Sequence, residues 1–125
     1  MKQHNAKLAY ICSPYRGDVK RNKEYAREIT RIAITHGFIP VTPHLYFTEA
    51  LDDNVPEERE LGLAAGIELL KRCDFIIIGE KYGVSEGMSN ELHTALENDV
   101  RFLFAGKEAI YITSQKDQWE REVQQ

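Results

Sequence analysis

The sequence predicts a single α/β domain with a mostly parallel sheet of four to five strands and helices on both faces. Its 125 residues suit one domain with one hydrophobic core. Short apolar runs alternate with segments whose apolar residues recur at helical spacing. The chain shows no repeat, low-complexity segment or linker, so we assign residues 1–125 to one domain.

The first half of the chain predicts two strands joined by a helix. Residues 8–12 form a short apolar run that ends at a turn-rich segment, and Asp18 is a suitable N-cap for a helix beginning at Val19. Helical spacing continues to His36 and Gly37. Residues 38–42 form the second strand, and Pro40 within it favours a position at the edge of the sheet.

The second half predicts a further alternation of helices and strands. Residues 45–51 are compatible with a short helix, and a turn leads to Pro56, which suits the first position of a helix reaching about Arg72. Residues 75–78 form the third strand, and a helix follows from 86 or 87 to 98. Residues 101–104 and 109–113 are the last strands, and the polar residues 114–123 suit a surface helix.

Charge and composition restrict the possible functions. The net charge of −4 argues against binding a nucleic-acid polymer through a basic surface. No apolar run approaches the roughly 20 residues that span a membrane, and the first residues lack the apolar region of a signal peptide. We therefore expect a cytoplasmic protein without membrane contact. Cys12 and Cys73 are expected to be small buried thiols, and no residue pattern indicates a metal site.

The region between the third strand and the next helix is the best candidate for a ligand site. In parallel α/β sheets, ligands bind at the carboxyl ends of the strands. Ser85, Gly87 and Ser89 are small residues near a predicted helix start, where backbone N–H groups can bind a phosphate. Glu91 follows about one turn into this helix. It is either an acidic residue favoured by the helix dipole or a carboxylate that faces the ligand.

The loops after the first three strands should meet at one rim of the sheet. They would bring together Ser13, Tyr15, Arg16 and Asp18, then His44 and Tyr46, then Tyr82, Ser85 and Glu91. Arg16 either clamps a phosphate or is a surface arginine near Asp18. His44 is either a general acid or base-ring contact, or a loop histidine bonded to the backbone. Tyr82 could stack on a base or cover the core.

These motifs together resemble the nucleoside 2-deoxyribosyltransferase superfamily. The resemblance covers about residues 8–105. It rests on Tyr-x-Cys-x-x-x-Arg-Gly (Tyr10 to Gly17), on His44, and on Ser-x-Gly-x-x-x-Glu (Ser85 to Glu91). The nearest characterised branch is the 2′-deoxynucleoside 5′-phosphate N-hydrolases, and the chain is similar to small bacterial and phage domains of the superfamily. This resemblance implies a Rossmann-like, flavodoxin-type domain of three layers that forms a homodimer or a higher homo-oligomer.

The resemblance also implies roles for individual residues. Glu91 matches the nucleophile that attacks C1′ of the sugar, and Tyr10 matches a tyrosine that helps to place it. Ser85, Gly87 and Ser89 match the 5′-phosphate loop, and Arg16 matches an arginine near the phosphate and sugar. His44 matches a pocket histidine. The implied substrate is a nucleoside or nucleoside 5′-monophosphate, and the chemistry needs neither a metal nor an organic cofactor.

One position departs from the family pattern. The family has an aspartate eight residues before the aspartate that opens the third strand, and here Gly66 occupies that place before Asp74. Glu60 or Glu68 could substitute, although a shift of two residues rotates a side chain by about 200° around a helix. Three hypotheses therefore remain: an N-glycosidic enzyme, a nucleotide-binding module without turnover, and an assembly protein with a vestigial pocket.

Overall fold

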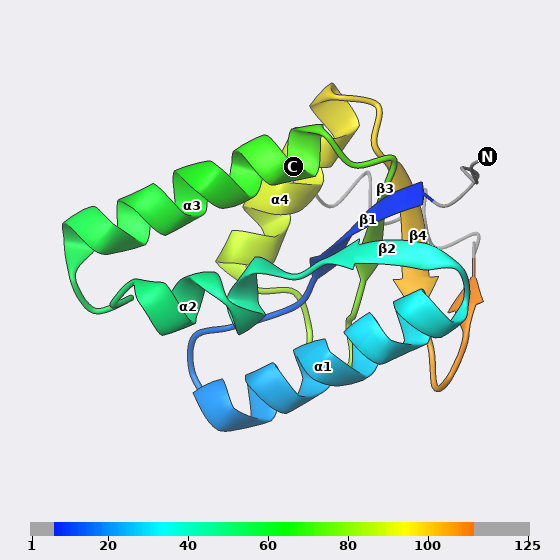
Figure 1. The fold of residues 1–125 in the computed structure, drawn as a ribbon, viewed down its shortest axis with the longest axis horizontal. Coiled ribbons are helices and arrows are strands. Elements are labelled where there is room, and N and C mark those ends of the chain that lie inside the picture. Colours follow the sequence, from blue (N-terminus) through cyan, green and yellow to red (C-terminus); the bar gives the residue numbers. More distant parts are fainter. Residues whose placement is uncertain (1–6, 112–125) are drawn as a thin grey trace.

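The computed structural model describes residues 7–111, which form a sheet with helices on both faces (Figure 1). The strands are β1 (Lys7–Cys12), β2 (Phe38–Val41), β3 (Phe75–Ile78), β4 (Arg101–Ala105) and β5 (Ile110–Tyr111). The helices are α1 (Val19–Thr35), the 3₁₀ helix η1 (Pro43–Leu45), α2 (Phe47–Ala50), α3 (Pro56–Lys71) and α4 (Glu86–Glu97). This arrangement confirms the predicted α/β class with a mostly parallel sheet.

The five strands lie in the order β2-β1-β3-β4-β5. The first four are parallel, and β5 pairs with β4 in the antiparallel direction. This is the order of flavodoxin-like sheets, in which the connections reverse direction between β1 and β3. Ligands of such sheets bind in the crevice outside the carboxyl ends of these two strands. The fold therefore places a candidate site after Cys12 and Ile78, which face each other in the register.

Helices cover the two faces of the sheet unequally (Figure 1). On one face, Tyr25, Ile29 and Ala33 of α1 pack against Ile11 and Ile77 of the sheet. On the other face, α3 and α4 pack against Tyr10, Cys12, Ile76, Ile78 and Phe104. Side chains alternate between the faces along each strand, so neighbours such as Tyr10 and Ile11 enter different cores.

Local sequence signals explain where most elements begin and end. The Asp18 carboxylate accepts a hydrogen bond from the Arg21 backbone N–H at 3.1 Å, which confirms the predicted N-cap of α1. That helix ends before Gly37, whose φ of 91° belongs to the left-handed region that suits glycine. Pro56 occupies the first turn of α3, and Ser85 caps α4. Strand β2 lies at the edge, as Pro40 predicts.

Several predicted boundaries were wrong by a few residues. The second strand ends at Val41, because Thr42 precedes the 3₁₀ turn of Pro43–Leu45. The single short helix predicted for residues 45–51 is instead two pieces, η1 and α2, which meet at Tyr46. Residues 114–123, predicted as a surface helix, lie outside the described residues. Within residues 7–111, no helix is both long and apolar enough to cross a membrane.

Candidate active site

Glu91 and Tyr10 form a hydrogen-bonded pair between α4 and the sheet. The Tyr10 hydroxyl donates to Glu91 Oε2 at 2.5 Å, although the two residues are far apart in the sequence. Tyr10 is almost fully buried. The other carboxyl oxygen of Glu91, Oε1, is buried and has no hydrogen-bond partner among the described residues. A buried carboxyl with one unused oxygen is a group that a ligand can engage.

The fold explains how this pair forms. Tyr10 points from β1 toward the α3 and α4 layer, because it belongs to the core cluster on that face. The Ser85 hydroxyl accepts a hydrogen bond from the Met88 N–H at 3.2 Å, which fixes the first turn of α4. Met88 and Leu92 are buried on the sheet side of the helix. Glu91 lies three residues after Met88, so its side chain projects from the same side of α4.

Burial changes the chemistry of the Glu91 carboxyl. Removal from water raises the pKa of Glu91 from 4.5 to about 7, while hydrogen bonds from Tyr10 and Cys12 oppose this rise. Burial and the nearby carboxyl raise the pKa of Tyr10 well above 10, so its hydroxyl remains a donor at neutral pH. Glu91 therefore titrates near neutrality, as is typical of carboxyls that take part in catalysis.

The predicted phosphate loop lies at the amino end of α4. Ser85 is exposed and its hydroxyl is used for capping, while Gly87 is exposed and Ser89 is half-buried. Ser13 follows β1, the strand beside β3, and its hydroxyl is buried without a partner among the described residues. The rim between β1 and β3 thus combines an unpartnered hydroxyl with a helix amino terminus, a combination that suits an anionic ligand.

Gly66 lies directly against the Tyr10–Glu91 pair. A Cβ atom built on Gly66 would stand 3.4 Å from the Tyr10 hydroxyl oxygen. The two candidate replacements for a carboxylate at this position point elsewhere. Glu68 is exposed and pairs with Lys71 and Arg72 on its own helix, and Glu60 is exposed as well. Within residues 7–111, neither of these two glutamates is placed beside Glu91.

Arg16 is an exposed arginine whose carboxylate partner is Asp53. Its Nε donates to the Asp53 carboxylate at 3.0 Å, and Arg59 donates to the same carboxylate at 3.1 Å. Asp18 instead caps α1. This bridge ties the loop after β1, where Gly17 adopts a φ of 98°, to the turn before α3. The Arg16 side chain remains 59% exposed, so it is also open to a ligand.

His44 and Tyr15 lie face to face beside this bridge. Their ring centroids are 5.4 Å apart, with an angle of 29° between the planes. Burial lowers the pKa of His44, and a hydrogen bond with the backbone of Ser13 and the charge of Asp53 oppose this effect. The imidazole is therefore mostly neutral at pH 7. The described contacts of His44 run to Tyr15 and Ser13, so the structure brings it to the rim but does not join it to Glu91.

Tyr82 belongs to the α1 side of the rim. Its ring packs edge-on against Tyr25, and the Arg21 guanidinium lies 3.9 Å from its centroid. These contacts match the interpretation in which Tyr82 covers the edge of the core. A base that stacked on the ring face that Arg21 covers would have to displace Arg21.

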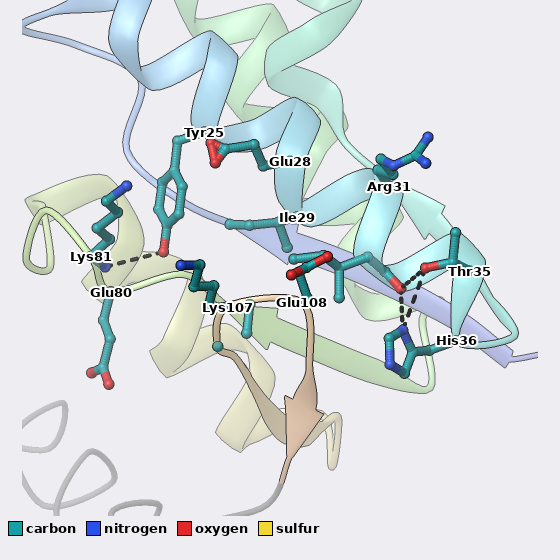
Figure 2. A pocket seen from close by; sticks show the side chains of 13 residues that line it. Tyr25, Glu28, Ile29, Arg31, Thr35, His36, Glu80, Lys81, Lys107 and Glu108 are labelled. Carbon is teal, nitrogen blue, oxygen red and sulfur yellow. Dashed lines mark hydrogen bonds between the residues drawn. The ribbon is translucent and has the colours of Figure 1, made fainter.

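A large hollow on the described surface does not coincide with Glu91. It has a volume of about 890 Å³ and lies between α1 and the turn that joins β4 to β5 (Figure 2). Some of its polar groups bond within the protein: the Tyr25 hydroxyl accepts from the Lys81 N–H, and Thr35 and His36 bond to the Ile32 carbonyl. A smaller hollow of about 430 Å³ is lined by Tyr15, Asp53 and other residues near the α2–α3 turn. Glu91 lines neither of these two hollows.

Three residues at the site were not predicted as site residues. Cys12 lies two residues after Tyr10 on the same face of β1, and this alternation was a signal that could have identified it. The Asp53 carboxylate accepts hydrogen bonds from both Arg16 and Arg59, but the distance of Asp53 and Arg59 from the first loop in the sequence gave no such signal.

Comparison with known proteins identifies a family. Residues 7–105 match the family described as "Domain of unknown function (DUF7768)". A comparison with curated proteins found no match. The matched range includes β1, α3, α4 and every residue of the candidate site.

Proposed function

The chain belongs to the family described as a domain of unknown function (DUF7768), and we propose that it cleaves or transfers the N-glycosidic bond of a nucleoside or nucleoside 5′-monophosphate. The observation that carries this proposal is the buried Tyr10–Glu91 pair at the β1–β3 end of the sheet. A carboxyl that titrates near pH 7, with one oxygen that has no well-formed hydrogen bond within residues 7–111, is equipped to act as a nucleophile at a sugar carbon. The resemblance to the deoxyribosyltransferases supports the same chemistry.

In the first step, the ionised Glu91 attacks C1′ through Oε1, the oxygen that Tyr10 does not hold. A C1′–O bond forms and the C1′–N bond breaks, and the base leaves with the bonding electron pair and takes up a proton. Tyr10 holds Oε2 throughout, so the attacking oxygen keeps its direction.

In the second step, an acceptor breaks the glycosyl ester. Water attacks C1′, loses a proton and returns the carboxylate to Glu91, which completes hydrolysis; a second base in place of water gives transfer. His44 is mostly neutral at pH 7 and could exchange protons at the rim. Because the described contacts of His44 do not include Glu91, we assign it to proton exchange with the base or with solvent.

The remaining rim residues suit the rest of a nucleotide. The amino end of α4, with Ser85, Gly87 and Ser89, and the buried Ser13 hydroxyl suit a 5′-phosphate. Arg16 can bind an anionic ligand if it releases Asp53, because a guanidinium binds a phosphate in the same way as a carboxylate. Tyr15, stacked with His44, offers an aromatic face for a base.

The test is release of free base from a panel of nucleosides and 5′-monophosphates, both ribo and deoxy, followed by chromatography. We expect release by the wild-type protein and loss of release in Glu91→Gln, which keeps the shape of the side chain but removes the nucleophile. Glu97→Gln, an exposed position in the same helix, is the matched control and should release base at the wild-type rate. Equal release by Glu91→Gln would refute the proposal.

One observation favours a second function, a nucleotide-binding module without turnover. Gly66 places no carboxyl beside the pair, and Glu60 and Glu68 point elsewhere, so none of these three positions in α3 supplies a second acid to protonate the leaving base. Losing a general acid costs about 10² to 10⁴ in rate. A panel nucleotide that raises the melting temperature without any release of base would favour this module. No stabilisation by any nucleotide would instead favour the vestigial pocket.

A further inference from the structure

Cys12 and Tyr10 occupy equivalent places on β1. They lie two residues apart, so both side chains point to the α3 and α4 face of the sheet, where both belong to the same core cluster. Cys12 is fully buried, and its thiol forms no disulfide. Burial and the neighbouring Glu91 raise the pKa of Cys12 well above 9, so the sulfur keeps its proton and remains a hydrogen-bond donor.

Two acceptors lie within reach of this thiol, and both belong to α4. The Met88 carbonyl oxygen stands 4.0 Å from the Cys12 sulfur, at the limit of a hydrogen bond to sulfur. The second acceptor is the Glu91 carboxyl, one turn further along the helix, on which Cys12 acts as a donor. Tyr10 takes Oε2, which leaves Oε1 buried and without a well-formed hydrogen bond among the described residues.

We propose that Cys12 is a positioning residue for Glu91: its thiol donates to Oε1 when the carboxyl is ionised and to the Met88 carbonyl when the carboxyl is protonated. This inference rests on the proposed function, because it concerns the state in which Glu91 reacts. In a buried site, each donor favours the ionised carboxyl, and a weak donor leaves Oε1 free to attack. Tyr10 thus donates a strong hydrogen bond to one carboxyl oxygen. Cys12 donates a weak hydrogen bond, which breaks easily, to the other.

The groups that act on Glu91 are few within residues 7–111. Strand β1 contributes Tyr10 and Cys12, and α3 contributes Gly66, which carries no titratable group. A change at Cys12 should therefore appear directly in the titration of Glu91.

The test follows the Glu91 carboxyl carbon by NMR across a pH series, assigned with Glu91→Gln. We expect the midpoint to rise by about half a pH unit or more in Cys12→Ala, because a donor to the ionised form is lost. Cys12→Ser keeps a donor, so its midpoint should lie at or below the wild-type value. Cys73→Ala removes the other buried thiol of the same core cluster and is the matched control, with an unchanged midpoint. Equal midpoints in the wild type and Cys12→Ala, or equal rises in the alanine and serine variants, would overturn the proposal.

A second measurement observes the Cys12 thiol of the wild-type protein directly. The infrared S–H stretching band of Cys12, assigned by its loss in Cys12→Ser, should shift as Glu91 titrates and should stay constant with pH in Glu91→Gln. If the band of the wild type does not shift as Glu91 titrates, the thiol does not change its acceptor and the proposal is refuted. Neither measurement uses a substrate. The inference can therefore fail while base release succeeds, and base release can fail while Cys12 still positions a ligand-binding carboxyl.

Discussion

At the scale of single residues, the state of Glu91 decides what the site can do. Its carboxyl is buried beside Tyr10, and its pKa of about 7 means that both protonation states are populated at neutral pH. The ionised form is the nucleophile, so base release should increase as pH rises through about 7. The same burial has a cost for folding, because an ionised carboxyl loses its water when the chain folds.

We therefore expect Glu91→Gln to stabilise the protein at alkaline pH. The pKa of Glu91 is raised in the folded state, so the wild type loses stability as pH increases from about 4.5 to about 7, and the loss is complete above that range. The two pKa values correspond to on the order of 3 kcal/mol. Urea unfolding at pH 4 and pH 8 measures this effect. The free energy of unfolding of Glu91→Gln, relative to that of the wild type, should be higher at pH 8 than at pH 4. A pH-independent difference between them would contradict the burial of the charge.

At the scale of secondary-structure elements, α3 shapes the site through the absence of a side chain. Only Gly66 and Leu70 of this helix are buried, and Gly66 touches the Tyr10 hydroxyl. The helix thus approaches the Tyr10–Glu91 pair closely at Gly66. A side chain much larger than a methyl group at this position would require its neighbours to move.

Substitution of Gly66 by aspartate should place a second carboxyl beside Glu91. Like charges disfavour ionisation, so one carboxyl of the pair should have a further raised pKa, and stability should fall as pH rises from 5 to 8. Gly66→Ala is the control; it adds no charge and gains up to about 1 kcal/mol in helix propensity. Unfolding of the two variants at both pH values measures the difference. If the proposed function holds, the aspartate variant should also release base faster, because it regains a second acid.

Most elements could be predicted from the sequence, because their signals are local. The apolar run Phe75–Ile78, the Asp18 cap and Pro56 each act within a few residues of the element that they define. The bridge from Arg16 to Asp53 could not be predicted, because it depends on how two loops meet after folding. The break between η1 and α2 was missed because the periodicity of residues 45–51 is too short to fix a helix type.

The candidate site was predicted in part for the same reason. Topology brings the loops after β1, β2 and β3 to one rim, so Ser13, His44 and Ser85 could be grouped from their positions in the sequence. Topology does not fix which way a side chain turns. Tyr82 lies against α1, and only the packing decides between the two arrangements expected for it. The alternation along β1 places Cys12 on the same face as Tyr10 but does not by itself bring it near Glu91.

At the scale of the whole molecule, the outward face of α3 suggests where a second copy could bind. Leu61 is 63% exposed there, and Ala64 and Ala65, at helical spacing from it, are exposed as well. Acidic residues begin the helix and Lys71 and Arg72 follow at its end, so two antiparallel copies would match opposite charges. The resemblance to the deoxyribosyltransferases implies a homodimer or a higher homo-oligomer, without fixing the surface that forms it.

Light scattering after size-exclusion chromatography tests this expectation. The wild-type protein should have about twice the chain mass of 14.4 kDa. Leu61→Glu should shift it to the monomer mass, because a buried charge would disfavour the contact. Ile34→Glu, at a similarly exposed apolar residue on α1, should leave the assembly unchanged. Dissociation by Ile34→Glu but not by Leu61→Glu would place the interface on the other face.

The stereochemistry at C1′ tests the central claim most directly, because it reports whether Glu91 itself bonds to the sugar. The reaction would be run in water with methanol as a second acceptor, and the configuration of the methyl glycoside would be read by NMR. Attack by Glu91 followed by attack by methanol inverts C1′ twice, so the account predicts a product with the β configuration of the substrate. An inverted α product, or the absence of any product, would contradict the assignment of Glu91 as the nucleophile.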